Sequence, residues 1–413
     1  GLARVGTPAL RTRLGLELLT LSGLSGDLEG VVHAARSIGD DADDDTRLLA
    51  AATRLFGEGL TLSLQDPEGT YRLARTLVEA GAGDALLIDR LEMSRALTDL
   101  ADGRLLDARH RFAGDRTALG PWLTVEALLA DAWAPVVEAE SVAAEAVAAL
   151  EAFDPLGNLP QARGLLALRR AQQGVASDPV PPPESEPGVA AIQAIMDDRA
   201  DAWLSRSPAA LVDVGRRAVA MGHRLWGLCC FIDAVRLGAR DEVAADVEQF
   251  AVAGGVGLAR VAAIHARAAT VDDHWAAARA WWAAGATSYG AEAALAGAVS
   301  DRDRAGLQLL ATSAAPTVGD WPPTGPWTDR QVGVVRRVLD GATNQAIADE
   351  LFISRRTVEN HLHAAYSAAG LEGRDDLRDR FGWIAEPESE PTAGTAANRP
   401  GRPTMSTPTS ANE

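Results

Sequence analysis

The chain has 413 residues, of which 47% are hydrophobic and 23% charged, and its formal net charge is −18. All 39 basic residues are Arg, which excludes sites that require Lys: a phosphate loop ending in Gly-Lys-Ser/Thr, a lysine Schiff base and a kinase lysine. The forked guanidinium can still bind phosphates, so nucleic-acid binding is not excluded.

The two cysteines and the absence of long apolar runs indicate in which cellular compartment the protein is expected. Cys229 and Cys230 are adjacent, a poor arrangement for a disulfide framework or a metal site. No charge-free apolar run of about 18 residues occurs, and the first thirty residues do not resemble a signal peptide. We therefore expect a soluble, reduced, cytoplasmic protein with no membrane partner.

Proline-rich stretches divide the chain, because several prolines prevent a helix from continuing. We predict six segments: an N-terminal helical array at 1–176, a Pro-rich linker at 177–187, a second helical array at 188–314, a linker at 315–326, a helix-turn-helix domain at 327–384 and a disordered tail at 385–413.

The first array has helical periodicity from residue 10 to about residue 174. Apolar residues recur at three- and four-residue spacing, and no stretch alternates as a strand does. We predict helices at 44–56, 69–80, 84–100 and 121–150.

The second array has the same character. Val243, Val247 and Phe250 fall on one face of a helix for which Asp241 is the predicted N-cap. Trp275 and Trp282 share a face of the helix that follows at about 272–284. Five tryptophans of this part form a candidate ligand groove, although aromatics at helical spacing more often belong to a core: Trp203, Trp226, Trp275, Trp281 and Trp282.

Helices of this length, joined by short glycine turns and rich in Ala, indicate antiparallel pairs stacked in an array. No fixed period between 30 and 50 residues holds, so the repeat is degenerate. The predicted fold class is all-α: a TPR-like, degenerate α-solenoid followed by a helix-turn-helix domain.

The C-terminal segment has the signature of three consecutive helices. Thr328 and Gln331 form a capping box for the first, with Val332, Val335 and Leu339 predicted on its inner face. Thr343 and Ser354 are predicted to cap the second and third helices. The arrangement is that of a helix-turn-helix with a supporting first helix.

The third helix has one apolar and one polar face. At about 100° per residue, Val358, Leu362 and Ala365 fall in one narrow sector and are expected to face the core. The opposite face has five polar residues: Arg356, Glu359, Asn360, His363 and Ser367. A local basic patch is expected from Arg330, Arg336, Arg337, Arg355 and Arg356, although the segment at 327–384 has eight Arg and nine acidic residues.

The stretch from Trp327 to Leu377 resembles the C-terminal DNA-binding domain of LuxR-type transcriptional regulators. The matching positions are Thr328, Arg330, Val334, Gly341, Asn344, Ile347, Ala348, Leu351, Ile353, Ser354, Thr357, Val358, Asn360, His361, Leu362, Gly370 and Arg374. Glu359 and Ala368 stand where the family often has Lys. The resemblance implies binding of double-stranded DNA as a homodimer, with RNA polymerase as a further partner.

Residues 212–313 resemble the helical region of the large, MalT-like regulators of this type, in which an ATP-binding domain comes first. The resemblance rests on the segments at 233–238, 265–268 and 291–294. Two alternatives remain open. Either the chain, which begins with Gly1, is the C-terminal part of a longer regulator, with ATP as a cofactor only in that case, or the array alone receives an unknown small-molecule or protein effector.

We therefore predict a sequence-specific, LuxR-type transcriptional regulator that is not an enzyme, with the helical array as sensor or transmitter. No catalytic or metal-binding constellation is expected. The alternative is a helical scaffold for protein interactions whose helix-turn-helix has lost DNA binding. The predicted DNA-binding residues are Asn344, Ser354, Arg355, Arg356, Thr357, Glu359, Asn360, His361 and His363.

Overall fold

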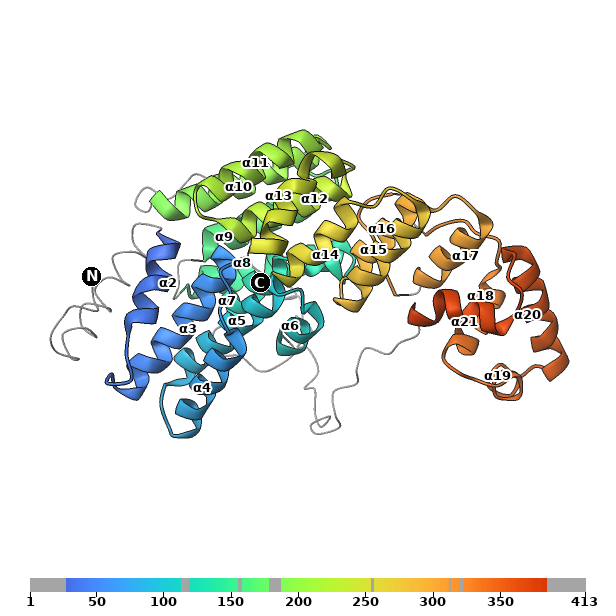
Figure 1. The fold of residues 1–413 in the computed structure, drawn as a ribbon, viewed down its shortest axis with the longest axis horizontal. Helices are drawn as coiled ribbons and strands as arrows, with labels where there is room; N and C mark the ends of the chain where they lie inside the picture. The colour runs from blue at the N-terminus through green and yellow to red at the C-terminus, as the bar shows by residue number, and fades with distance from the viewer. Residues whose placement is uncertain are drawn as a thin grey trace, which may run out of the picture.

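The computed structural model describes residues 27–112, 119–154, 158–177, 187–253, 256–311, 313–319 and 322–384. Helices are the only regular elements within these ranges, which confirms the predicted all-α class. Figure 1 shows an elongated array of helices with the C-terminal helices at the end opposite the first ones. Residues 1–26, most of the predicted linker at 177–187 and the whole predicted tail at 385–413 lie outside the described residues.

The helices of the array follow one another with short connections. They are α2 (Leu28–Ser37), α3 (Asp44–Thr61), α4 (Pro67–Glu79), α5 (Ala85–Ala101), α6 (Leu105–Phe112), α7 (Leu119–Ala127), η2 (Ala130–Ala132), α8 (Val136–Ala152), α9 (Leu159–Gln172), α10 (Pro187–Leu204), α11 (Pro208–Ala220), α12 (Arg224–Arg236), α13 (Arg240–Ala253), α14 (Gly257–Ala266), α15 (Val271–Ala283), α16 (Thr287–Gly297) and α17 (Asp301–Leu310). The C-terminal helices are α18 (Asp329–Leu339), α19 (Asn344–Glu350), α20 (Arg355–Ala369), α21 (Arg374–Phe381) and η3 (Gly382–Ile384).

Neighbouring helices of the array pack closely, as in α9 against α10 and α11 against α12. Glycines allow this approach: a Cβ atom added at Gly164 would lie 2.5 Å from Met196 Cβ, and one added at Gly215 would lie 2.5 Å from Phe231 Cε1. Such packing of successive helices is what an α-solenoid requires. The TPR-like character of the repeat and the predicted segment boundaries stay predictions.

The prediction of a single helix at 121–150 is wrong. The chain instead forms α7, the short η2 and α8, with Pro135 immediately before α8. Pro135 has no backbone N–H, so a helix cannot run through it with its hydrogen bonds intact. The free carbonyls at the end of α7 accept hydrogen bonds from a buried guanidinium, since Arg169 Nη2 lies 2.7 Å from Ala127 O and 3.0 Å from Leu128 O.

Two smaller expectations in the second array also differ. Helix α13 begins at Arg240, so Asp241 lies in its first turn and is not the N-cap. The tryptophans do not form one groove, because Trp203, Trp226 and Trp281 are buried in the core.

The break between α7 and α8 places Asp131 at the centre of a buried charge network. Its carboxylate lies 2.7 Å from Arg169 Nη1 and 2.9 Å from Arg236 Nη1, and it accepts hydrogen bonds from Gln172 and Tyr289. Although burial by itself raises the pKa of Asp131, these guanidiniums hold the pKa well below its usual value. The carboxylate therefore stays charged and joins helices from distant parts of the chain.

The same network extends to the segment that precedes the C-terminal helices. Arg236 donates to both carboxylate oxygens of Glu292, over 2.6 and 3.0 Å. Glu292 Oε1 in turn accepts the backbone N–H groups of Thr317 and Val318, over 2.8 and 3.0 Å. The predicted linker at 315–326 is thus hydrogen-bonded to the array at its beginning.

We predict that Asp131→Asn lowers the free energy of unfolding by about 3–5 kcal/mol, because it leaves Arg169 and Arg236 buried with less compensating charge. The change is measured by urea unfolding followed by circular dichroism. Glu151→Gln is the control, since its pair with Arg163 is exposed and should contribute less than about 1 kcal/mol. Equal effects of the two substitutions would contradict a structural role of the network.

Candidate nucleic-acid interface

The first helix of the C-terminal domain begins where the capping box predicts. Gln331 N donates to Thr328 Oγ1 over 3.3 Å, and Thr328 N donates to Gln331 Oε1 over 2.8 Å. The two side chains therefore satisfy backbone groups that the first turn of α18 would otherwise leave free.

The buried face of α18 differs from the prediction. Val334, Val335 and Val338 are buried, whereas Val332 and Leu339 are only partly buried. All three predicted residues face the core, because Val332 and Leu339 pack against it as partly buried residues, and the structure adds Val334 and Val338 to this face. The domain core is completed from α20 and α21, whose buried residues include Val358, Leu362, Ala365, Leu377 and Phe381.

The turn between α19 and α20 is sharp and left-handed. Phe352 has a φ of 54°, and the residue is 95% exposed. Two residues later Ser354 caps α20 by accepting the backbone N–H of Thr357 over 3.1 Å. The predicted caps Thr343 and Ser354 are both present.

Helix α20 has the two faces that its sequence predicts. Val358, Leu362 and Ala365 are buried. The predicted polar face is exposed at all five of its positions: Arg356, Glu359, Asn360, His363 and Ser367. Because these residues are exposed although the array is present, no described helix of the array covers this surface.

Ion pairs reduce the basic patch that the sequence predicts. Arg355 Nε lies 2.9 Å from Glu359 Oε1, one turn along the same helix, and Arg337 Nη2 lies 2.7 Å from Glu350 Oε1. Arg336 turns away toward the array, where it donates to Leu309 O over 3.1 Å.

In the part of the chain that the structure describes, the other two arginines of the predicted patch, Arg330 and Arg356, are not engaged by a carboxylate or by the array. Within the described ranges Arg330 and Arg356 have no carboxylate partner, although Arg330 donates to Leu351 O over 3.3 Å. Arg356 therefore has its full charge available to a phosphate.

The predicted DNA-binding residues fall into two groups. Six of them are exposed around the N-terminal half of α20: Ser354, Arg355, Arg356, Glu359, Asn360 and His363. Asn344, Thr357 and His361 are only partly buried, and Asn344 Oδ1 accepts a hydrogen bond from Arg374 over 2.6 Å. Asn344 thus ties α19 to α21, and the DNA contacts of all nine residues stay predictions.

Sequence reasoning missed Phe352 as a surface residue. It lies in the turn between Leu351 and Ile353, which are partly buried. The available signal was a large aromatic residue in a turn of a helix-turn-helix. Its exposed ring lies two residues before Ser354, the cap of α20.

The domain also has contacts with the array that the sequence did not reveal. Gln308 of α17 exchanges two hydrogen bonds with the backbone of Trp327, over 2.8 and 3.0 Å. The Trp327 indole then donates to Ala365 O of α20 over 2.8 Å. Arg302 of α17 donates to the carbonyl of Gly370, the residue that ends α20. Helix α17 is therefore joined to α20 at two places.

An aromatic cluster completes this attachment. The rings of Trp275 and Trp282 on α15 lie 6.3 and 5.8 Å from the ring of Trp383, and Trp275 lies 5.9 Å from Phe381. Trp275 and Trp282 share a face of α15, as predicted. This face packs against the C-terminal domain.

Residues 326–377 match the family model described as bacterial regulatory proteins, luxR family. The match covers α18, α19, α20 and the first part of α21, and it confirms the resemblance stated for this segment. A search of the curated proteins found no match, and neither did a search of the solved structures. The likeness of the array to MalT-like regulators stays a prediction. Among the described helices, none has the length and apolar character needed to cross a membrane.

We predict that Phe352→Asn leaves the free energy of unfolding unchanged or raises it by up to about 1 kcal/mol. Asn adopts a left-handed backbone at lower cost than Phe, and the exposed ring contributes no buried area. Phe381→Asn serves as the comparison and should be strongly destabilising, because Phe381 is buried. Urea unfolding measures both, and a clear loss of stability in Phe352→Asn would show that this ring is not free in solution.

Proposed function

Because residues 326–377 form a LuxR-family domain, we propose that the chain is a transcriptional regulator that places α20 in the major groove of specific DNA sequences. The observation that supports this most directly is the exposed polar face of α20, which stays uncovered with the array in place. Since its proposed target is chromosomal DNA, we expect it to act in the cytoplasm.

The exposed residues have chemistry suited to different parts of a duplex. The amide of Asn360 can pair with adenine, and Glu359 can accept from the amino group of cytosine. Arg356, the hydroxyl of Ser354 and the N-terminus of α20 can bind backbone phosphates. The proposed division is therefore phosphate contacts at the start of α20 and base contacts one turn later.

Electrostatics sets the strength of this binding. Residues 327–384 have a net charge of −1, with eight Arg and nine acidic residues, and the rest of the chain has a net charge of −17. Non-specific affinity comes mainly from neutralised phosphates, so a single domain should bind weakly and with strong salt dependence. We propose that a homodimer on two half-sites about one helical turn apart supplies useful affinity.

We further propose that the array acts as sensor and transmitter. Three contacts support this role: Glu292 binds the segment before the domain, α17 contacts α20, and Trp383 packs against α15. An effector that alters the packing of the array would therefore change the position of the domain, and with it the spacing of two recognition helices or a contact with RNA polymerase.

We predict that Glu359→Lys raises affinity for random duplex DNA about tenfold at low salt. The substitution adds a positive charge and also releases Arg355 from its ion pair, so the slope of log K against log salt should steepen by about 1. Fluorescence anisotropy over a series of salt concentrations measures both effects.

Glu151→Lys is the matched control, because it makes the same charge change on an exposed position of α8. Equal responses of the two variants would mean that α20 does not meet the duplex. A dimeric wild-type protein that does not bind random duplex at tens of micromolar would favour the alternative function, a protein-interaction scaffold.

A further inference from the structure

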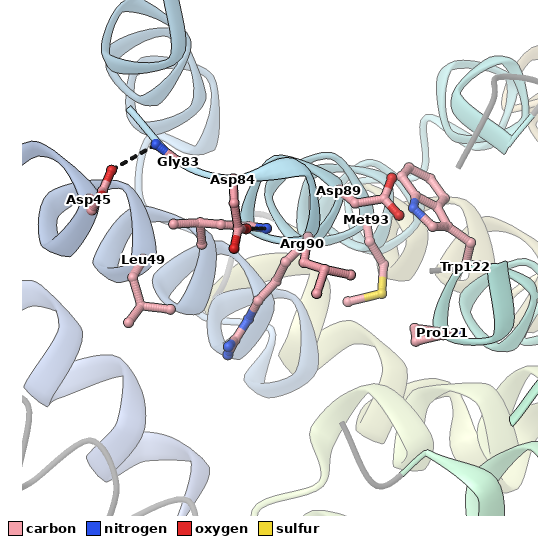
Figure 2. Close-up of a pocket in the computed structure, with 11 residues that line it drawn as sticks. Asp45, Leu49, Gly83, Asp84, Asp89, Arg90, Met93, Pro121 and Trp122 are labelled. Carbon is pink, nitrogen blue, oxygen red and sulfur yellow. Dashed lines mark hydrogen bonds between the residues drawn. The ribbon is translucent and has the colours of Figure 1, made fainter. Parts of the chain in front are cut away.

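A cavity of about 420 Å³ lies between α3, α5 and α7 in the first half of the array. Its volume falls in the range of small-molecule sites in proteins. Figure 2 shows the side chains that line it, with Leu49 on α3, Arg90 and Met93 on α5, and Trp122 on α7. The cavity is separate from the tryptophans that the sequence suggested as a ligand groove.

Most of the cavity wall is apolar. Six side chains form this part of the surface: Leu49, Leu86, Leu87, Met93, Pro121 and Trp122. A hydrocarbon group placed here would lose contact with water on several sides, which favours binding in proportion to the apolar area removed from water.

Arg90 is the one basic residue of the cavity lining, and it has no countercharge among the residues that the structure describes. Its Nη2 donates to Thr53 Oγ1 over 3.2 Å, and within the described ranges no carboxylate lies at ion-pair distance from it. Nearby arginines of the same helices are paired, as in Arg54 with Glu58 over 2.7 Å and Arg95 with Asp99 over 3.0 Å. Burial without such a partner lowers the pKa of Arg90.

Three carboxylates also line the cavity, and each already has a partner. Asp45 Oδ1 accepts the backbone N–H of Gly83 over 2.7 Å, and Asp84 Oδ1 accepts that of Leu87 over 2.8 Å. Both are exposed at the rim, so water screens their charge. Asp89 has an interaction of its own. The group that would gain most from a new partner is therefore the desolvated guanidinium of Arg90.

We propose that this cavity binds a small organic acid with a hydrocarbon body, whose carboxylate pairs with Arg90 and whose apolar part lies against Leu49, Met93 and Trp122. A guanidinium can hold a carboxylate through two parallel hydrogen bonds. Binding itself is independent of the proposed function, whereas a role as effector rests on it.

The location of the site gives the occupant a way to affect the array. Helix α5 packs against α14 and is followed directly by α6, whose first residue, Leu105, donates its backbone N–H to Ala284 O at the end of α15 over 3.0 Å. Helix α15 provides Trp275 and Trp282, which contact the DNA-binding domain. A ligand that shifts α5 relative to α3 would therefore reach the domain through two contacts. The first joins α6 to the end of α15, and the second joins α15 to Trp383.

The proposal is tested by isothermal titration calorimetry of the full chain with octanoate, 1-octanol and octylammonium. We expect octanoate to bind at least tenfold more tightly than octylammonium, and Arg90→Gln to weaken octanoate about tenfold while leaving 1-octanol unchanged. Arg72→Gln is the control and should leave all three affinities unchanged, because Arg72 is exposed and outside the cavity. Circular dichroism checks that each variant is folded.

A second variant locates the site. Leu49→Trp fills part of the cavity and should abolish octanoate binding without loss of helical content. No octanoate binding at millimolar concentration, tighter binding of octylammonium, or equal octanoate affinity in wild type and Arg90→Gln would each overturn the proposal.

A separate measurement distinguishes this proposal from the proposed function. Anisotropy with duplex DNA, with and without octanoate, reports DNA binding alone. Octanoate binding without any DNA binding would support the proposed organic-acid site and contradict the proposed DNA-binding function. DNA binding without octanoate binding would support the DNA-binding function and contradict the organic-acid site.

Discussion

The fold depends on the pairing of buried arginines with Asp131. Arg169 and Arg236 lie in the interior of an otherwise apolar helical array, and neither could stay there without a carboxylate, since an unpaired buried charge costs several kcal/mol. Asp131 lies in the short 3-10 helix η2, which interrupts the chain between α7 and α8. From there its carboxylate contacts Arg169 of α9, Arg236 of α12 and Tyr289 of α16.

The network also connects the array to the DNA-binding domain. Glu292 shares its carboxylate between Arg236 and the backbone of Thr317 and Val318, so the segment leading to the domain leaves the array in a defined direction. From there Gln308 and Trp383 attach the domain at two further places. The domain is held by contacts on one side, and the polar face of α20 lies exposed on another.

The surface around α20 has both arginines and carboxylates, and several of them form ion pairs. A chain in which every basic residue is Arg could present a strong phosphate-binding patch, yet three of the five arginines near α20 are engaged by carboxylates or by the array. Arg356 is exposed at the start of α20 and, within the described ranges, has no carboxylate partner. Under the proposed function, this arrangement lowers non-specific attraction to a duplex and leaves more of the DNA affinity to base contacts and dimerisation.

The sequence by itself determined the features that depend on neighbouring residues. The caps at Thr328, Thr343 and Ser354, the buried stripe of Val358, Leu362 and Ala365, and the all-α class follow from local hydrogen bonding and from helical periodicity. The resemblance of residues 327–377 to the LuxR family rests on the same short-range pattern.

Only the tertiary structure decided which side chains from distant segments meet. Asp131 and Tyr289 are 158 residues apart. Neither the partners of Trp275 and Trp282 nor the lack of a carboxylate partner for Arg90 among the described residues is visible in any local pattern. Pro135 is visible in the sequence, but the pairing of Asp131, in the segment before it, with buried arginines of α9 and α12 is not. Burial and pairing are properties of the folded molecule, and they depend on contacts that no window of sequence contains.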